Sequence, residues 1–166
     1  MNKVRFLTLL LVLGVSGCAL RPVYAGGASG PVASSLTAIS VAPIPNRAGW
    51  LMRNALVDRL GGDNKGAAYR LEVDLDDDIS GFGIRGDRSI TRERRTLRAR
   101  YRLVQQSTGL VLIDATAGSD AGIDVVSSPY ATVAAEQTAL ERLSKVVADQ
   151  IVARLALYAT SRPIGR

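Results

Sequence analysis

The single cysteine of this chain, Cys18, lies at the end of a short apolar leader and is the residue best placed for covalent chemistry. Lys3 and Arg5 give the leader a positive start. The apolar stretch that follows, residues 6–13, is too short to span a bilayer core of roughly 30 Å. Small or aliphatic residues, 15–17, directly precede the cysteine. This arrangement predicts a bacterial lipoprotein-processing site, where the thiol is acylated and the leader is cut just before it.

The alternative is that Cys18 is an ordinary residue at the end of a secretory leader, or a small hydrophobe in a core. Arg21-Pro22 and a loose Gly/Ala/Ser/Pro stretch follow it, so no strand or helix is predicted to bury it. Acylation would also explain why an exported chain holds one cysteine and no disulfide partner. Because each buried CH₂ contributes about 0.8 kcal/mol, two or more acyl chains would make Cys18 a stable membrane anchor. This covalent lipid is the only cofactor that we predict.

The rest of the sequence offers little for catalysis. The chain has no histidine and no second thiol, so it lacks the usual general base, metal ligand and nucleophile of small hydrolases. Asp76 and Asp78 share a strand face but have no acid partner in an apolar pocket. The acidic run 74–78 lacks the glycine and the closing glutamate of a calcium loop. We therefore predict no catalytic residue, no metal site and no enzymatic activity.

Two neighbouring segments carry complementary rows of charge at every second position. Period-two alternation predicts two strands joined by a turn, so both rows should lie on one exposed face of a sheet. The acidic row is Glu72, Asp74, Asp76 and Asp78, and the basic row is Arg92, Arg94, Arg98, Arg100 and Arg102.

Three interpretations of these rows stay open, and strand register decides between them. Opposed charges can form cross-strand ion pairs on a solvated sheet, each contributing about 0.2–1 kcal/mol. The five arginines can instead bind phosphate or a polar partner wall, since a guanidinium holds phosphate and carboxylate side by side. The charges can also protect the sheet from aggregation. Nucleic acid is not a predicted partner, because exported lipoproteins do not normally meet duplex DNA and the one interleaved aromatic, Tyr101, points to the core side.

Composition divides the chain into four parts. Residues 1–17 are the signal peptide, 18–35 a lipidated N-terminus with a flexible linker, 36–160 a single domain, and 161–166 a C-terminal tail. The formal charge of +6 falls to +4 when Lys3 and Arg5 leave with the leader, which weakly favours an anionic partner.

Periodicity within the domain predicts an α+β fold. Strands are expected at 37–42, 69–79, 90–105 and 110–117, and amphipathic helices at 46–60 and 128–158. The glycine-rich stretch 80–87 is predicted to be a turn. The order β-α-β-β-β-α predicts an antiparallel four-stranded sheet with both helices packed on one face and charge on the other.

Several short motifs, taken in order, resemble the LptE family of lipopolysaccharide-assembly lipoproteins in its alphaproteobacterial form. The likeness covers most of the mature chain, although Trp50 stands where the family would lead us to expect a polar residue. The motifs are Cys18-Ala19-Leu20-Arg21-Pro22-Val23-Tyr24, Ile39-Ser40-Val41-Ala42-Pro43-Ile44, Arg47-Ala48-Gly49, Leu51-Met52-Arg53-Asn54-Ala55-Leu56 and Ala148-Asp149-Gln150-Ile151.

The resemblance implies a lipoprotein anchored on the periplasmic side of the cell outer membrane. It implies that the partner is a large outer-membrane β-barrel translocon, whose assembly the lipoprotein assists and whose lumen it plugs, and that lipopolysaccharide is a second partner. Ala19 after the cysteine agrees with sorting to the outer membrane. The alternative function is that of an auxiliary lipoprotein in a periplasmic lipid-transport complex, which would bind lipid or a transport complex without entering a barrel.

Overall fold

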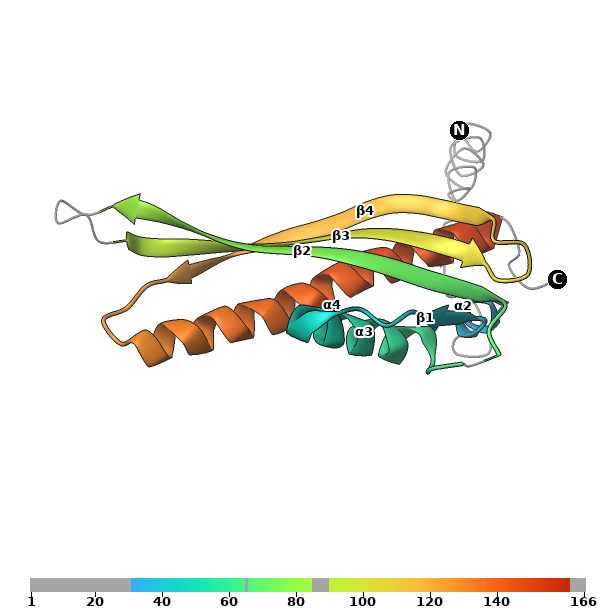
Figure 1. The fold of residues 1–166 in the computed structure, drawn as a ribbon, viewed down its shortest axis with the longest axis horizontal. Coiled ribbons are helices and arrows are strands. Elements are labelled where there is room, and N and C mark those ends of the chain that lie inside the picture. The colour runs from blue at the N-terminus through green and yellow to red at the C-terminus, as the bar shows by residue number, and fades with distance from the viewer. Residues whose placement is uncertain (1–30, 65, 85–89, 162–166) are drawn as a thin grey trace, which may run out of the picture.

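The computed structural model describes residues 31–64, 66–84 and 90–161. The predicted leader, Cys18 and most of the predicted tail lie outside this part of the chain. The described residues form an elongated α+β body with one sheet and three helices (Figure 1). The elements are α2 (Pro31–Thr37), β1 (Ile39–Val41), α3 (Asn46–Leu60), β2 (Tyr69–Ile84), β3 (Ile90–Gln105), β4 (Val111–Asp124) and α4 (Pro129–Ser161).

The four strands lie in the order β1-β2-β3-β4. The β2–β3 and β3–β4 pairs are antiparallel, whereas β1 pairs with β2 in parallel over Tyr69–Leu71. The prediction of an α+β fold with a four-stranded sheet is confirmed, but the sheet is mixed and not purely antiparallel. The physical reason is that α3 carries the chain back along β1, so β2 starts at the same end as β1.

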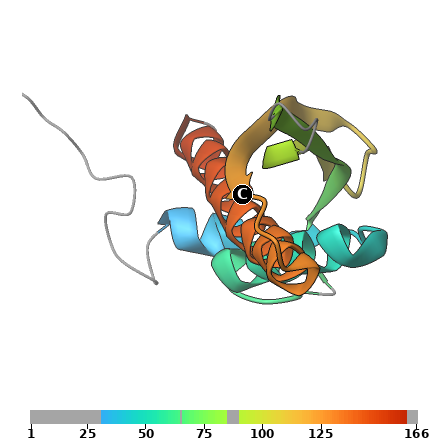
Figure 2. The ribbon, with the colours of Figure 1, turned by 90° about the vertical axis from the view of Figure 1, so that its left-hand side faces the viewer.

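Helices α3 and α4 cover one side of a strongly curved sheet, as the end-on view in Figure 2 shows. The predicted bounds of α3 are confirmed, and its end is set by Gly61, whose φ of 89° lies in the left-handed region that glycine favours. Helix α4 is slightly longer than predicted. Its buried side chains form one continuous stripe, whereas Val133 in its first turns is 49% exposed.

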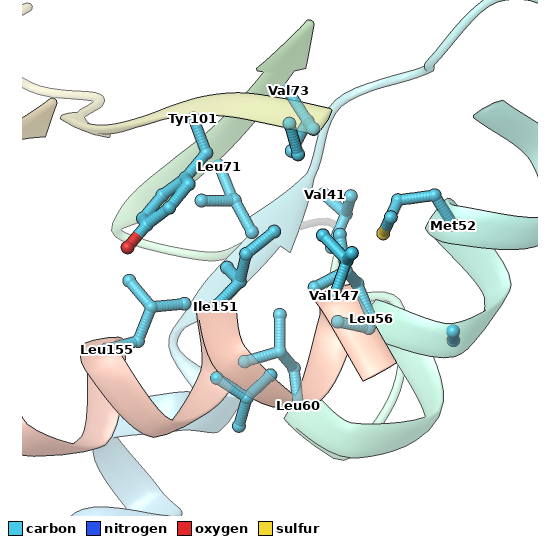
Figure 3. Close-up of a cluster of buried hydrophobic side chains, with 14 of the residues drawn as sticks. Val41, Met52, Leu56, Leu60, Leu71, Val73, Tyr101, Val147, Ile151 and Leu155 are labelled. Carbon is cyan, nitrogen blue, oxygen red and sulfur yellow. The ribbon is translucent and has the colours of Figure 1, made fainter. Parts of the chain in front are cut away.

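The core lies between the sheet and the two long helices. Leu71 and Val73 of β2 face Val147, Ile151 and Leu155 of α4, and α3 closes the cluster from the side. Figure 3 shows these side chains converging, with Tyr101 of β3 at one border. Tyr101 is 2% exposed, so its predicted orientation toward the core is confirmed, and this burial raises the pKa of its hydroxyl.

Two segments differ from their predicted structure. The Gly-rich residues 80–83, predicted as a turn, continue β2 to Ile84, because their backbone pairs with β3 up to Arg92. Residues 31–35, which have linker composition, belong to helix α2, where Val32 and Leu36 are buried against the core. In both segments tertiary pairing and burial override a local composition that favours irregular backbone.

Gly49 lies where α3 passes closest to the preceding turn. A Cβ built on it would lie 2.6 Å from the carbonyl oxygen of Ile44, a backbone atom that cannot rotate away. Although alanine is normally the better helix residue, we expect Gly49→Ala to lower the free energy of unfolding by about 1–3 kcal/mol. Urea unfolding followed by circular dichroism measures this. Gly122→Ala in β4 is the control, since its Cβ meets nothing within 4 Å, and equal stability of both variants would contradict the argument.

Candidate functional site: the charged sheet face

Strand register brings the two predicted rows together on the sheet face opposite the helices. Glu72 lies opposite Arg102, Asp74 opposite Arg100 and Asp76 opposite Arg98. The pairing between β2 and β3 runs without a bulge, so every even-numbered residue of both strands stays on this face. We call it the charged face. Asp78 lies opposite Thr96, and Arg94 and Arg92 lie opposite Ser80 and Phe82, so only part of each row meets its counterpart.

The ion pairs on the charged face are only partly those expected from the two rows. Arg102 binds Glu72 at 3.1 Å, and Arg70 binds the same carboxylate at 2.7 Å from its own strand. Among the described residues, Asp74, Asp76 and Asp78 form no ion pair within 4.0 Å. Most of the arginines in the basic row of β3 bind carboxylates of β4 instead of β2.

A third row of charge on β4 was missed by the sequence analysis. Asp114 binds Arg100 at 2.8 Å, Asp124 binds Arg92 at 3.2 Å, and Asp120 approaches Arg94 to 3.9 Å. The three aspartates occupy even positions of one strand, and that period of two was the signal available in the sequence. The Arg100 guanidinium beside Asp114 lowers the pKa of that carboxyl, and the carboxylate raises the pKa of the arginine.

The charged face is therefore striped and close to neutral, and it is not a basic patch. Arginines run along β3, and carboxylates flank them on β2 and β4. In the described part of the face, six arginines accompany seven carboxylates. The arginines are Arg70, Arg92, Arg94, Arg98, Arg100 and Arg102, and the carboxylates are Glu72, Asp74, Asp76, Asp78, Asp114, Asp120 and Asp124. Exposed ion pairs of this kind contribute little to stability, because water screens them.

Arg98 differs from the other arginines of the row. It forms no ion pair within 4.0 Å with the described residues, and Gly118 lies opposite it on β4. A Cβ on Gly118 would lie 3.3 Å from Cγ of Arg98, so the glycine leaves room for the arginine stem. Arg98, Arg100, Asp74 and Asp76 line an open hollow of about 500 Å³ with Thr116 and Gly118. Arg98 is thus the one arginine of the row that has no carboxylate partner among the described residues, although two carboxylates line the same hollow.

Arg95, on the opposite side of the same strand, has a structural role. It donates hydrogen bonds to Asp77 at 2.6 and 2.7 Å and to the main-chain oxygen of Glu136 at 2.9 Å. The hydrogen-bonded Asp77 carboxylate raises the pKa of Arg95. This contact joins β2, β3 and α4 in one cluster.

The described residues contain no group of three or more Asp, Glu, His or Cys side chains that could hold a metal ion. None of the described helices is both long and apolar enough to cross a membrane.

A family model described as LptE, lipopolysaccharide-assembly, matches residues 36–155. No curated protein sequence matches the chain. Among solved structures, a candidate lipoprotein from Caulobacter crescentus is similar with 25% sequence identity and a TM-score of 0.67, covering 80% of this chain and 98% of that one.

Two further solved structures share the fold at lower identity. Rare lipoprotein B from Shewanella oneidensis is 11% identical with a TM-score of 0.59, covering 74% of this chain and 96% of its own. A minor lipoprotein from Acinetobacter baumannii is 14% identical with a TM-score of 0.60, covering 72% and 90%.

Proposed function

Since the chain belongs to the LptE family and so has a role in lipopolysaccharide assembly, we propose that it plugs the β-barrel translocon of the outer membrane and assists its assembly. In this role it aids insertion of lipopolysaccharide into the outer leaflet, while a lipid on Cys18 holds it on the periplasmic side. The family supports the role in lipopolysaccharide assembly, and the charged face is the structural observation that supports a place inside a barrel.

The charged face suits the polar lumen of a barrel. Its stripes of arginine and carboxylate cannot pack against an apolar core without a large desolvation cost. The helices already bury their apolar stripes against the other side of the sheet, so the charged face is left to meet water or a polar wall. Because the face carries both arginines and carboxylates, it can bind anionic as well as cationic groups of a partner.

Within this face we assign the anion contact to the arginine row of β3, with Arg98 as its principal member. Arg92, Arg94, Arg100 and Arg102 already hold carboxylates in the free chain. A lipopolysaccharide phosphate would have to compete with those carboxylates, whereas Arg98 has no such partner among the described residues.

Photocrosslinking in intact cells tests the proposal. A photoreactive residue at Arg94 or Arg98 is expected to capture the barrel wall or lipopolysaccharide, several-fold more than the same residue at Arg142 on the exposed side of α4. The product is identified by its mass and by antibody to the barrel or to lipopolysaccharide. Capture of neither partner from Arg94 and Arg98, or equal capture from Arg142, would contradict this placement of the charged face.

The second candidate is an auxiliary lipoprotein of a periplasmic lipid-transport complex. The hollow beside Arg98 favours it as well, because a lipid headgroup could bind there without any barrel. Purification from detergent-solubilised outer membrane separates the two functions. Co-purification of a large β-barrel supports the plug, and its absence beside a transport complex supports the alternative.

A further inference from the structure

Within residues 31–64, 66–84 and 90–161, one edge of the sheet has no pairing strand along most of its length. Strand β1 pairs with β2 only at Tyr69–Leu71, and the last bond of this pair runs from the amide of Ala42 to the carbonyl of Leu71. Pro43 and Pro45 then turn the chain away, and neither has an N–H with which to continue the ladder. Strand β2 nevertheless runs on to Ile84.

The polar backbone groups of this free edge can be assigned from the register. Tyr69 and Leu71 bond to β1, so the odd-numbered residues of β2 direct their N–H and C=O groups away from β3. Because the β2–β3 pairing has no bulge over this stretch, Val73, Leu75 and Asp77 do the same. They present a short ladder of hydrogen-bonding groups ready to receive another strand.

A groove of about 590 Å³ lies along this ladder. Its floor and far wall come from the β1–α3 turn and from α4, and the free edge of β2 forms the near wall. Its lining includes Val73, Leu75 and Asp77 of β2, Ile44 and Ala48 from the β1–α3 side, and Leu140 of α4. A strand of about five residues, roughly 16 Å long, would extend the sheet here as a continuation of β1.

Charges of both signs lie beside the groove, and together they bear on its occupant. Arg95 lines the groove but is already bound to Asp77, and Arg47 lines it from the start of α3. Asp74, Asp76 and Asp78 stand exposed on the edge strand and form no ion pair within 4.0 Å among the described residues. A strand added to β2 would place its outward side chains beside them. A second copy pairing through the same edge would set acidic row against acidic row, which is unfavourable. The added strand that fits best has basic side chains on the face that carries Asp74, Asp76 and Asp78. Its apolar side chains then lie on the other face, toward Ile44 and Leu140.

From these observations we infer that the free edge of β2 binds an extended segment of a partner protein, with basic and apolar residues in alternation. The segment adds a strand to the sheet beside β1. This inference concerns the backbone edge of β2, which shares Asp74, Asp76 and Asp78 with the charged face. The crosslinking at Arg94 and Arg98 does not test edge pairing, so the inference can fail while the proposed function stands.

Amide hydrogen exchange of the full chain in detergent, followed by NMR, tests the inference. The probe is a blocked peptide of alternating lysine and valine, and its matched control carries glutamate in place of lysine. The lysine probe is expected to slow exchange at Val73, Leu75 and Asp77 about tenfold or more. Thr116 and Asp120, whose amides lie on the outer edge of β4, should not change. The chain carries a net charge of +6, so non-specific attraction does not favour the lysine probe.

Two triple variants separate edge pairing from general electrostatics. D74N/D76N/D78N should weaken binding of the lysine probe about tenfold or more, because it removes the charges beside the groove. D114N/D120N/D124N removes as many carboxylates from the other edge strand and should leave the affinity within about twofold. Circular dichroism of both variants checks that they fold.

Three results would overturn the inference. The first is equal binding of the lysine and glutamate probes, or protection of β4 instead of β2. The second is protection of Val73, Leu75 and Asp77 without any probe that disappears on dilution, which would identify a second copy as the occupant. The third is protection without probe that is independent of concentration and is lost when residues 18–30 are deleted, which would identify the chain's own N-terminal segment.

Discussion

Replacing Cys18 with serine is expected to release essentially all of the protein from the outer membrane. The substitution removes the one thiol in the chain, and with it the predicted acyl chains. At about 0.8 kcal/mol for each buried CH₂, two or more chains provide the affinity that holds such a protein on a bilayer. Fractionation of cells that lack the barrel measures the effect, since the barrel itself would retain a plug.

The control for this experiment is Ala19→Ser, which changes the neighbouring residue and keeps the thiol. It should remain in the membrane fraction, and mass spectrometry should show acyl groups on Cys18. A Cys18→Ser protein that still fractionates with the outer membrane in cells without the barrel would contradict the anchor assignment, as would an unmodified thiol on the native protein.

Leu155→Ala is expected to lower the free energy of unfolding by about 2–5 kcal/mol. Leu155 is completely buried where α4 meets the sheet (Figure 3). Truncating it removes apolar contacts and leaves a cavity that the surrounding helices and strands can close only in part. Because a domain of this size is held by about 5–15 kcal/mol, the loss is a large share of the total. Urea unfolding followed by tryptophan fluorescence and circular dichroism gives the value.

Leu157→Ala provides a control of the same residue type on the same helix. Leu157 is 52% exposed, so its truncation should change the free energy of unfolding by less than about 1 kcal/mol. If the two variants unfolded at the same urea concentration, α4 would not pack on the sheet through the stripe that contains Val147, Ile151 and Leu155.

Much of the fold follows from local pattern, and the parts that do not follow depend on tertiary contacts. The alternation in β2 and β3 and the bounds of α3 were visible in the sequence, because burial of one face imposes a period on the residues. The parallel pairing of β1 was not visible, since three residues, Ile39–Val41, carry no sign of strand direction. Helix α2 was also hidden, because its small residues become helical while Val32 and Leu36 are buried against the core.

The sequence predicted which charged residues make up the two rows of the candidate site. It did not predict which of them form ion pairs. The two rows of β2 and β3 lie side by side as expected, but Arg100 prefers Asp114 on β4 to the opposed Asp74 on β2. Such a choice depends on rotamers and on sheet twist, which a sequence pattern does not contain. Arg98 likewise has no ion pair among the described residues, and the residue opposite it on β4 is Gly118, which β3 meets only once β4 is in register.

The position of α2 has a mechanical consequence. Helix α2 lies at one pole of the long body, and the start of α4 lies near the other (Figure 1). With 33 residues in α4, the poles are about 50 Å apart, more than the roughly 30 Å thickness of a hydrocarbon layer. If the proposed lipid on Cys18 holds the chain that precedes Pro31, the α2 pole is the tethered one and the opposite pole is free to swing. An upright body would then carry its far tip across the depth of a bilayer, while a tilted one would keep it near the tethered surface.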